Sequence, residues 1–182
     1  INAINTTGTT GISSTASTSN IEITGNRISS VSSGITTSSA NILVANNFIQ
    51  ASSIGISSTA NAGKIVFNSV NVTGVTGTTR AMEIGGTSAQ TVKNNIFANN
   101  GNGYAVYRNS ATIPSGSDWD FNDYYSQLGF LGFYNAANQL SLSNWRIATS
   151  RDANSKDLDP YYVSATELRT YNRILNGAGV AA

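Results

Sequence analysis

The sequence contains neither cysteine nor histidine among its 182 residues. Without cysteine, the chain has no disulfide framework and no thiolate metal site, although this absence does not identify a cellular compartment. Without histidine, it lacks the commonest general base and metal ligand, so nucleophiles of the Ser-His and Cys-His kinds are excluded. Any chemistry must therefore come from other side chains.

Charge is also scarce. Charged side chains make up 10% of the sequence, against about a quarter in a typical soluble domain, and serine, threonine, asparagine and glycine take their place. The formal net charge of +1 offers no basic field for a phosphate backbone, so we expect no nucleic-acid partner. No run of about 18 apolar residues occurs, so we expect no membrane span.

One pattern recurs along the chain: an asparagine with an apolar residue three positions before it and two positions after it. The complete copies centre on Asn26, Asn47, Asn68, Asn95 and Asn122. Asn2 and Ile4 match the second half of the pattern. Successive asparagines, starting from Asn2, are 24, 21, 21, 27 and 27 residues apart. A repeat of this length indicates a solenoid, in which each copy forms one turn of the coil.

A second column supports the repeat. Apolar residues that each follow a glycine or an alanine recur in the same order: Ile12, Ile35, Ile56, Met82 and Val106. The segments between turns are short and rich in Ile, Val, Thr and Ser, which is typical of strands and too short for helices. Equivalent strands of successive turns would stack about 4.8 Å apart as a parallel sheet. We therefore predict an all-β chain, a parallel β-helix of about five to six coils with an irregular C-terminal cap.

The repeated asparagine has a physical reason. Asparagine tolerates the left-handed backbone region at a tight bend better than most residues. When asparagines stack at the same place in every turn, each side-chain amide can donate to one neighbour and accept from the other. Such a ladder satisfies buried polar groups that would otherwise cost about 1–3 kcal/mol each. We therefore predict an asparagine ladder through the complete copies of the repeat.

The repeat decays in the last third of the chain. Residues 1–125 are predicted to form the coils, and because Ile1 falls within a repeat, we expect an incomplete N-terminal side and a longer parent protein. Residues 126–182 are predicted to be a cap or a tail packed on the coil, since the end of a solenoid needs cover. Within them, residues 140–145 suggest a short capped helix or a last strand, and residues 167–175 suggest one or two helical turns.

Several short motifs occur in a fixed order: Phe-Asn-Asp-Tyr-Tyr at 121–125, Leu-x-x-Trp at 142–145, Asp-Ala-Asn-Ser at 152–155 and Asp-Pro at 159–160. With the Gly-Ile and Asn-Asn-x-Ile turns, they resemble the right-handed parallel β-helix proteins of the pectin-lyase-like fold that bacteria secrete or display. The resemblance implies a right-handed coil and an extracellular or cell-surface location. It implies function only weakly, because this fold hosts polysaccharide lyases, glycoside hydrolases, epimerases and non-catalytic adhesins.

Uronate lyases of this fold use a Lys or Arg base beside a neutralising group, often Ca²⁺ held by acidic side chains. Lys93 and Asp120 each lie two positions before their asparagine, so they should stack in adjacent turns. Glu83 and Tyr107 each follow the apolar column and should stack likewise. With Arg108, they suggest a shallow groove in which Lys93 or Arg108 is the base. The alternative is a set of ion pairs on a solvated face, worth about 0–1 kcal/mol.

Asp118, Asp120 and Asp123 suggest a second chemistry, in which paired carboxylates hydrolyse a glycosidic bond. In a strand, Asp118 and Asp120 share one face, whereas Asp123 lies past the bend. The alternative is a polar turn beside the apolar side chains of Trp119 and Phe121.

A third candidate is the acidic set Asp152, Asp157 and Asp159 around Asn154 and Ser155. These carboxylates could hold Ca²⁺, or they could cap a loop by accepting backbone N–H groups. The aromatic side chains of the C-terminal region leave a similar choice, between stacking on sugars and forming the core of the cap. They are Tyr124, Tyr125, Phe130, Phe133, Tyr134, Trp145, Tyr161 and Tyr162.

Few charges, no histidine and outer faces rich in Ser, Thr and Asn favour a non-catalytic extracellular segment that serves adhesion, carbohydrate binding or as a structural stalk. Its expected partners are a polysaccharide or cell-surface glycan and the rest of a longer chain, with no cofactor unless the acidic residues bind Ca²⁺. The alternative is a polysaccharide lyase or a glycoside hydrolase. A third hypothesis is a filament subunit, because the ends of a coil present strand edges that could stack.

Overall fold

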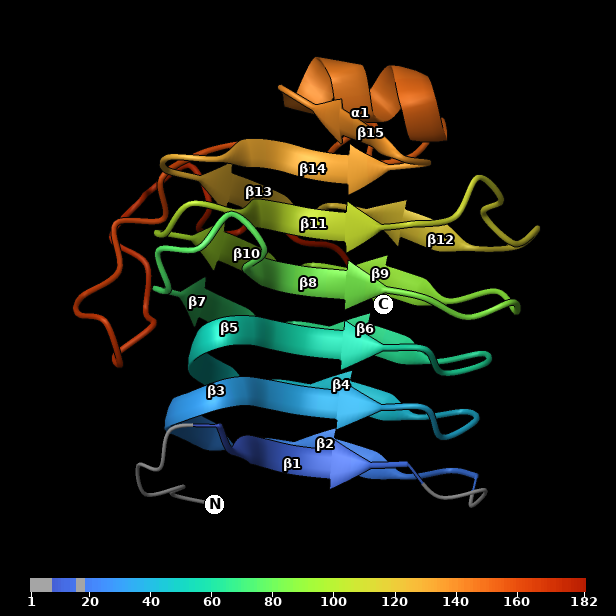
Figure 1. The fold of residues 1–182 in the computed structure, drawn as a ribbon, viewed down its shortest axis with the longest axis horizontal. Coiled ribbons are helices and arrows are strands. Elements are labelled where there is room, and N and C mark those ends of the chain that lie inside the picture. The colour runs from blue at the N-terminus through green and yellow to red at the C-terminus, as the bar shows by residue number, and fades with distance from the viewer. Residues whose placement is uncertain (1–7, 16–18) are drawn as a thin grey trace.

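The computed structural model describes residues 8–15 and 19–182, so the predicted partial repeat at Asn2 lies outside the described residues. The chain forms a β-solenoid of about five turns, in which equivalent strands of successive turns pair in parallel (Figure 1). The predicted all-β solenoid is confirmed.

One side of the coil is a parallel sheet with one three-residue strand from each turn. Its strands are β2 (Glu22–Thr24), β4 (Leu43–Ala45), β6 (Lys64–Val66), β9 (Thr91–Lys93) and β12 (Asp118–Asp120). Each strand is short because the chain bends into the asparagine turn directly after it. The central residue of each strand is buried, from Ile23 in the first turn to Trp119 in the last.

A second, larger sheet forms the two remaining sides. Its parallel strands are β1 (Thr10–Ser14), β3 (Arg27–Thr37), β5 (Phe48–Ser58), β7 (Ser69–Val72), β8 (Arg80–Ile84), β10 (Ile96–Asn99), β11 (Tyr104–Arg108), β13 (Asp123–Ser126) and β14 (Phe130–Tyr134). The long strand β5 pairs with both β7 and β8, so one strand of an early turn covers the path that two strands share in later turns.

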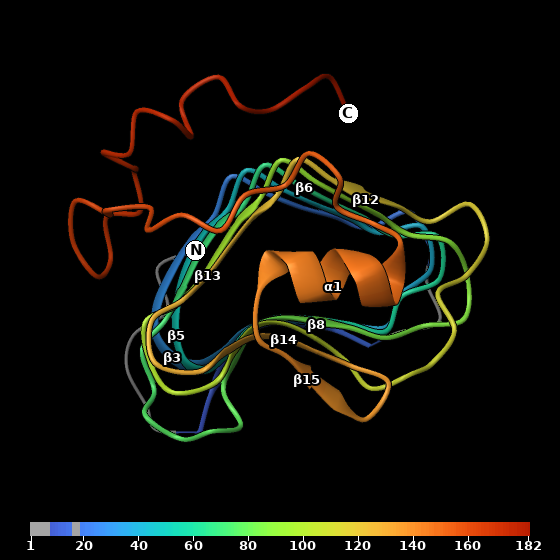
Figure 2. The same cartoon turned by 90° about the horizontal axis from the view of Figure 1, so that it is seen from above.

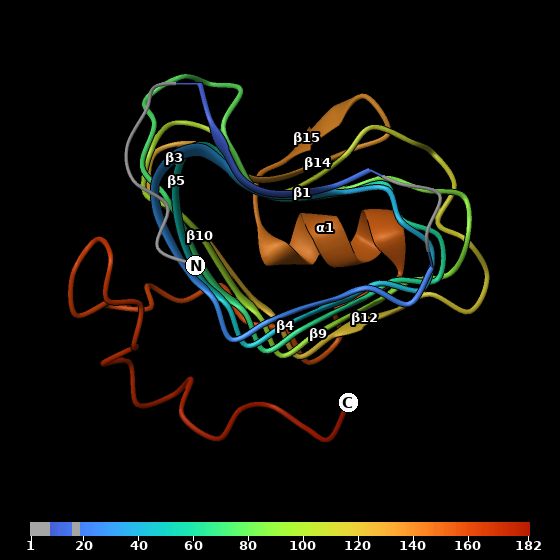
Figure 3. The same ribbon diagram turned by 90° about the horizontal axis from the view of Figure 1, so that it is seen from below.

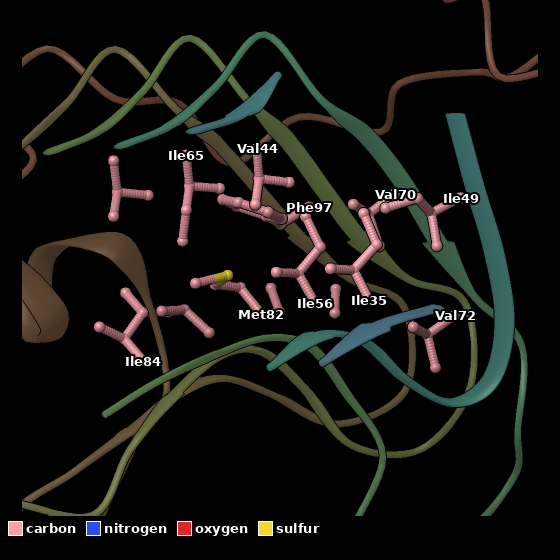
Figure 4. Packing of buried hydrophobic residues seen from close by; sticks show 14 of the residues in the cluster. Ile35, Val44, Ile49, Ile56, Ile65, Val70, Val72, Met82, Ile84 and Phe97 are labelled. Atoms are coloured by element: carbon pink, nitrogen blue, oxygen red, sulfur yellow. The ribbon is translucent and has the colours of Figure 1, made fainter. Parts of the chain in front are cut away.

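The interior is built from the predicted apolar column. In the strand register Ile12 pairs with Ile35, and the column continues through Ile56 and Met82 to Val106. From Ile35 onward these side chains are fully buried, and they pack against the inward residues of the other sides (Figure 4). The small residue before each of them has a steric reason. A Cβ added at Gly55 would lie 2.2 Å from Cγ1 of Val70.

The asparagine ladder is confirmed. The side-chain Nδ2 of Asn47 donates to Oδ1 of Asn68 at 2.9 Å, and the backbone N–H of Asn47 donates to the same oxygen at 3.1 Å. The same pair of bonds links Asn26 to Asn47, Asn68 to Asn95, and Asn95 to Asn122. Asn47 Nδ2 also donates to the carbonyl of Ile23 in the previous turn. From Asn47 onward, each rung therefore satisfies a buried amide whose burial without a partner would be costly.

The backbone of the ladder differs from the prediction in one respect. The left-handed conformation belongs to the residue before each ladder asparagine. These residues are Gly25, Asn46, Phe67, Asn94 and Phe121, with φ between 56° and 67°. The ladder asparagines Asn47, Asn68, Asn95 and Asn122 do not have positive φ. The bend is therefore completed one residue earlier, which lets the ladder amide point into the coil.

The last turn is closed by a cap. The antiparallel strand β15 (Ala137–Gln139) pairs with β14, and helix α1 (Leu142–Thr149) lies across the end of the coil (Figure 2). Ser141 caps the helix by accepting the backbone N–H of Asn144, so the structure has the first of the two alternatives for residues 140–145, a capped helix and not a last strand. Trp145 is fully buried above Gly132, where an added Cβ would lie 2.8 Å from Cε3 of the indole. The parallel stack thus continues past residue 125 into β14.

The segment after α1 ends the ladder. The backbone N–H of Asn122 donates to Ser155 Oγ at 2.9 Å, and its Nδ2 donates to Asp152 Oδ1 at 3.2 Å. Lys156 then pairs with Asp123 in a parallel bridge. Residues 152–156 therefore take the place of one further turn, with a hydroxyl and a carboxylate at the position of the next asparagine.

The remaining residues form a tail, 157–182, outside the coil. It runs along the corner between the two sheets, as the views from above and below agree (Figures 2 and 3). Tyr162 donates its hydroxyl to the carbonyl of Val70, and the Arg27 guanidinium pairs with Glu167 at 2.6 Å. The helical turns predicted for residues 167–175 are wrong. The side chains of Thr170 and Asn172 accept nearby backbone N–H groups, which competes with helix formation.

Candidate functional site

The predicted groove divides into two pairs on different sides of the coil. Lys93 and Asp120 are register partners in β9 and β12, and Glu83 and Tyr107 are register partners in β8 and β11. Both vertical pairs are as predicted. Strands β9 and β12 lie behind the coil in Figure 1, however, whereas β8 and β11 lie in front. The structure therefore does not bring these four side chains into one groove, because they belong to different sides of each turn.

Arg108 lies inside the coil and not on its surface. The side chain is 2% exposed, and its guanidinium donates to the carbonyls of Ile84, Gly85 and Gly86. Burial lowers the pKa of Arg108. The assignment of Arg108 as a surface base is therefore wrong, because the residue after outward-facing Tyr107 points inward. Its observed contacts hold the loop that follows β8.

The charged residues of β9 and β12 bind each other or the cap. The Lys93 ammonium lies 2.6 Å from Asp118, and not against its register partner Asp120. Asp120 instead accepts two hydrogen bonds of 2.7 Å from Asn154, one from the backbone N–H and one from Nδ2. This arrangement fits an ion pair on a solvated face, together with a carboxylate that anchors the segment after α1.

Asp123 is separated from the other two carboxylates of the proposed hydrolytic set. Asp118 and Asp120 lie at outward positions of β12, but Asp123 follows the bend and is 2% exposed. Its Oδ1 accepts the backbone N–H of Leu158. Burial raises the pKa of Asp123 to about 7, nearby Asp157 adds to this increase, and the hydrogen bond from Leu158 opposes it. The pairing of Asp123 with Asp118 or Asp120 around a glycosidic bond is therefore wrong.

The predicted acidic set after α1 is also divided. Asp152 is buried and accepts hydrogen bonds from Trp145 Nε1 at 2.8 Å and from Ser155 Oγ at 2.7 Å. Burial raises its pKa, which these hydrogen bonds counteract. Asp159 accepts the backbone N–H of Tyr161 in the tail, as expected for a loop cap. Among the residues that the structure describes, no three acidic side chains gather into a group that could hold a metal ion.

An outward cluster of aromatic rings is the most distinctive surface feature. We call it the aromatic face, and its members are Tyr104, Tyr107, Phe130 and Phe133 of β11 and β14. The rings of Tyr107 and Phe133 stack with centroids 4.7 Å apart and planes 8° apart. The rings of Tyr104 and Phe130 stack at 6.1 Å. None of the four is fully buried, and Phe130 is 37% exposed.

Polar groups border the aromatic face. The Arg80 guanidinium lies 3.9 Å from the centre of the Tyr107 ring and pairs with Glu83 at 2.7 Å. The Tyr104 hydroxyl donates to Asn138 Oδ1 at 3.0 Å. Rings, phenol hydroxyls, a cation and a carboxylate thus meet at one patch. The sequence interpretation missed this cluster, although the equal spacing of Tyr104 from Phe130 and of Tyr107 from Phe133 could have revealed it.

Other predicted aromatic residues have structural roles. Tyr124 and Trp145 are fully buried, and their ring centroids lie 6.2 Å apart under the cap. Tyr162 belongs to the tail, and its hydroxyl contacts the coil, whereas Tyr161 is exposed. The core alternative therefore applies to only part of the aromatic set. Tyr124 and Trp145 form core, and Phe130 and Phe133 belong to the outward cluster.

Comparison of the chain with protein-family models, curated proteins and solved structures found no match. Within the described part of the chain, no helix has both the length and the apolar character needed to cross a membrane.

Proposed function

We propose that the chain is a non-catalytic segment of an extracellular or cell-surface protein that binds a carbohydrate chain through the aromatic face. The observation that supports this proposal is the cluster of Tyr104, Tyr107, Phe130 and Phe133 beside the Arg80–Glu83 pair. Sugars combine apolar C–H surfaces with hydroxyl groups. Aromatic side chains with a polar end, placed beside a few charged groups, match both features.

The position of the cluster on the coil suggests how a glycan lies on it. Below Tyr107, the same register column contains Glu83, then Ser57 and Thr36. A sugar chain running along the coil axis would meet rings on the later turns and hydroxyl groups on the earlier ones. Adhesion or a stalk-like role within a longer protein would use the same rigid coil to hold this surface at a fixed distance from its attachment.

The proposal is tested by binding a panel of neutral and acidic polysaccharides to the purified chain in titration calorimetry. The double variant Tyr107→Ala with Phe133→Ala should lose affinity by at least about tenfold, because the stacked rings supply the apolar contact area. Tyr171→Ala is the control, since Tyr171 is an exposed aromatic residue of the tail. Equal affinities for the double variant and the parent would contradict the proposal.

The same incubations test the alternative, a polysaccharide lyase or a glycoside hydrolase. Products would be followed by the ultraviolet absorbance of unsaturated uronates and by reducing ends, with and without Ca²⁺. Product formation that Lys93→Ala abolishes would replace the non-catalytic proposal with a lyase in which Lys93 is the base. Binding without product would support a recognition segment.

A further inference from the structure

The corner between the two sheets carries two phenylalanines in an unfavourable backbone conformation. At the left-handed position before each ladder asparagine, the first, second and fourth turns have Gly25, Asn46 and Asn94. The third and fifth turns have Phe67 and Phe121, both with φ of 56°. Glycine and asparagine are the residues that tolerate this region, and a bulky side chain there is strained.

Packing does not account for Phe67. Its side chain is 43% exposed, so burial returns only part of the apolar free energy that a core phenylalanine would gain. Phe121, two turns further along and therefore about 10 Å away, is also only partly buried. Strained residues that the core does not require are typical of functional sites.

The tail contacts this corner at Asn94, in the turn between those of Phe67 and Phe121. The side chain of Asn94 forms two hydrogen bonds with the backbone of Val180. Its Nδ2 donates to the carbonyl at 2.8 Å, and its Oδ1 accepts the N–H at 2.9 Å. A Cβ on Gly179 would lie 2.9 Å from Asn94 Oδ1, so a glycine permits this approach. Asn94 thus fixes the tail at one point, and the tail becomes a wall opposite the rings.

A cleft of about 450 Å³ remains between the tail and the corner. We call it the corner cleft. Its apolar walls are Phe67, Ile96, Phe121, Leu175 and Val180. The volume is within the range of roughly 300–1,000 Å³ that small-molecule sites occupy, and such sites are mostly apolar with few polar groups.

One cation lines the corner cleft. The ammonium group of Lys156 forms no hydrogen bond or ion pair with any described residue. Its charge opposes the increase in the pKa of Asp123. The carboxyl of Asp123 also borders the cleft, but its Oδ1 accepts the Leu158 N–H and its Oδ2 is buried. The ammonium of Lys156 is therefore available to a ligand.

We propose that the corner cleft binds a small amphipathic anion, whose apolar body lies between Phe67, Phe121 and the tail and whose acidic group meets Lys156. The ligand class is an aryl or alkyl carboxylate or sulfonate. This site is separate from the aromatic face, because it lies on the asparagine corner and uses none of the same residues.

The test uses anilinonaphthalene sulfonate, a fluorescent aryl sulfonate, with decanoate as the competitor. Saturable fluorescence that decanoate reverses is the expected result for the intact chain. Lys156→Gln should weaken the competition by decanoate but leave the competition by uncharged decanol unchanged. Absence of saturable binding, or equal loss of decanoate and decanol, would overturn the assignment.

Phe67→Asn separates a binding role from a structural one. Asn46 and Asn94 occupy the same position in neighbouring turns, so this variant should fold with an unchanged or higher melting temperature because it relieves backbone strain. Its affinity for the sulfonate should fall by at least about tenfold with the loss of one apolar wall. Tyr171→Asn, which removes an exposed aromatic residue outside the cleft, should change neither. Unchanged affinity, or a lowered melting temperature, in Phe67→Asn would overturn the proposal.

Discussion

The first two complete turns and the three later ones share an interior but differ outside. In the early turns, β3 and β5 are continuous strands of 11 residues each. In the later turns, loops divide the same path into the pairs β7 with β8, β10 with β11, and β13 with β14. The ladder bonds stay within 2.9–3.1 Å throughout. Insertions are therefore compatible with the coil as long as the buried rungs keep their geometry.

The outer surface changes along the same axis. One register column passes from Thr36 and Ser57 to Glu83, and then to Tyr107 and Phe133. Inward positions must fill a core of constant width, whereas outward positions meet water and are free to vary. The repeated interior therefore supplies stability, whereas the outward aromatic side chains gather on the later turns.

The largest expected effect is a pH dependence of the free energy of unfolding that arises from Asp123 in the last turn. Asp123 occupies the position of Ile96 and Ser69 in the turns below, and its pKa is raised from 3.8 to about 7. The folded state therefore holds this proton more tightly than the unfolded state does. The resulting stabilisation is complete below about pH 4 and is lost as the pH rises to about 7, on the order of 4 kcal/mol.

Asp123→Asn should remove this dependence while keeping an acceptor for the Leu158 N–H. In urea unfolding, the variant should exceed the parent in stability at about pH 8 and approach it at about pH 4. A constant difference between the two proteins across this range would show that Asp123 does not titrate with a raised pKa.

We expect the ladder asparagines of early and later turns to contribute equally to the free energy of unfolding. Asn47→Ala in an early turn leaves the partly buried donors of Asn26 without their acceptor, and Asn95→Ala in a later turn does the same to the buried donors of Asn68. Each should lower the free energy of unfolding by about 3 kcal/mol. Asn46→Gly, which changes an exposed residue beside the ladder but outside it, should cost less than about 1 kcal/mol. Clearly unequal losses at Asn47 and Asn95 would refute a uniform ladder.

The smallest expected effect concerns the outer charges of the later turns. Lys93 and Asp118 form an ion pair whose acidic partner is 54% exposed. Lys93→Ala should change the free energy of unfolding by less than about 1 kcal/mol, and a double-mutant cycle with Asp118→Ala should give a coupling of similar size. A coupling above about 2 kcal/mol would mean that this surface ion pair stabilises the coil by as much as a buried interaction does.

Sequence reasoning succeeded where one chemical requirement repeats. The column from Ile12 to Val106 and the ladder from Asn26 to Asn122 were predicted residue by residue, because every turn must fill the same core and pair the same amides. Aligning those columns also predicted the register pairs of Glu83 with Tyr107 and of Lys93 with Asp120. The Lys93 ammonium nevertheless binds Asp118, because side-chain direction and the competing bonds of Asp120 with Asn154 are not set by register.

The solenoid, its ladder and its parallel register follow from short-range patterns that the sequence repeats at a regular spacing. The side of the coil that each residue occupies, in contrast, depends on the tertiary structure. That structure placed Arg108 inside, separated Lys93 from Glu83, and brought Val180 to Asn94. The physical reason is that bends within a turn and the course of the tail depend on packing between distant segments, for which the repeat contains no signal.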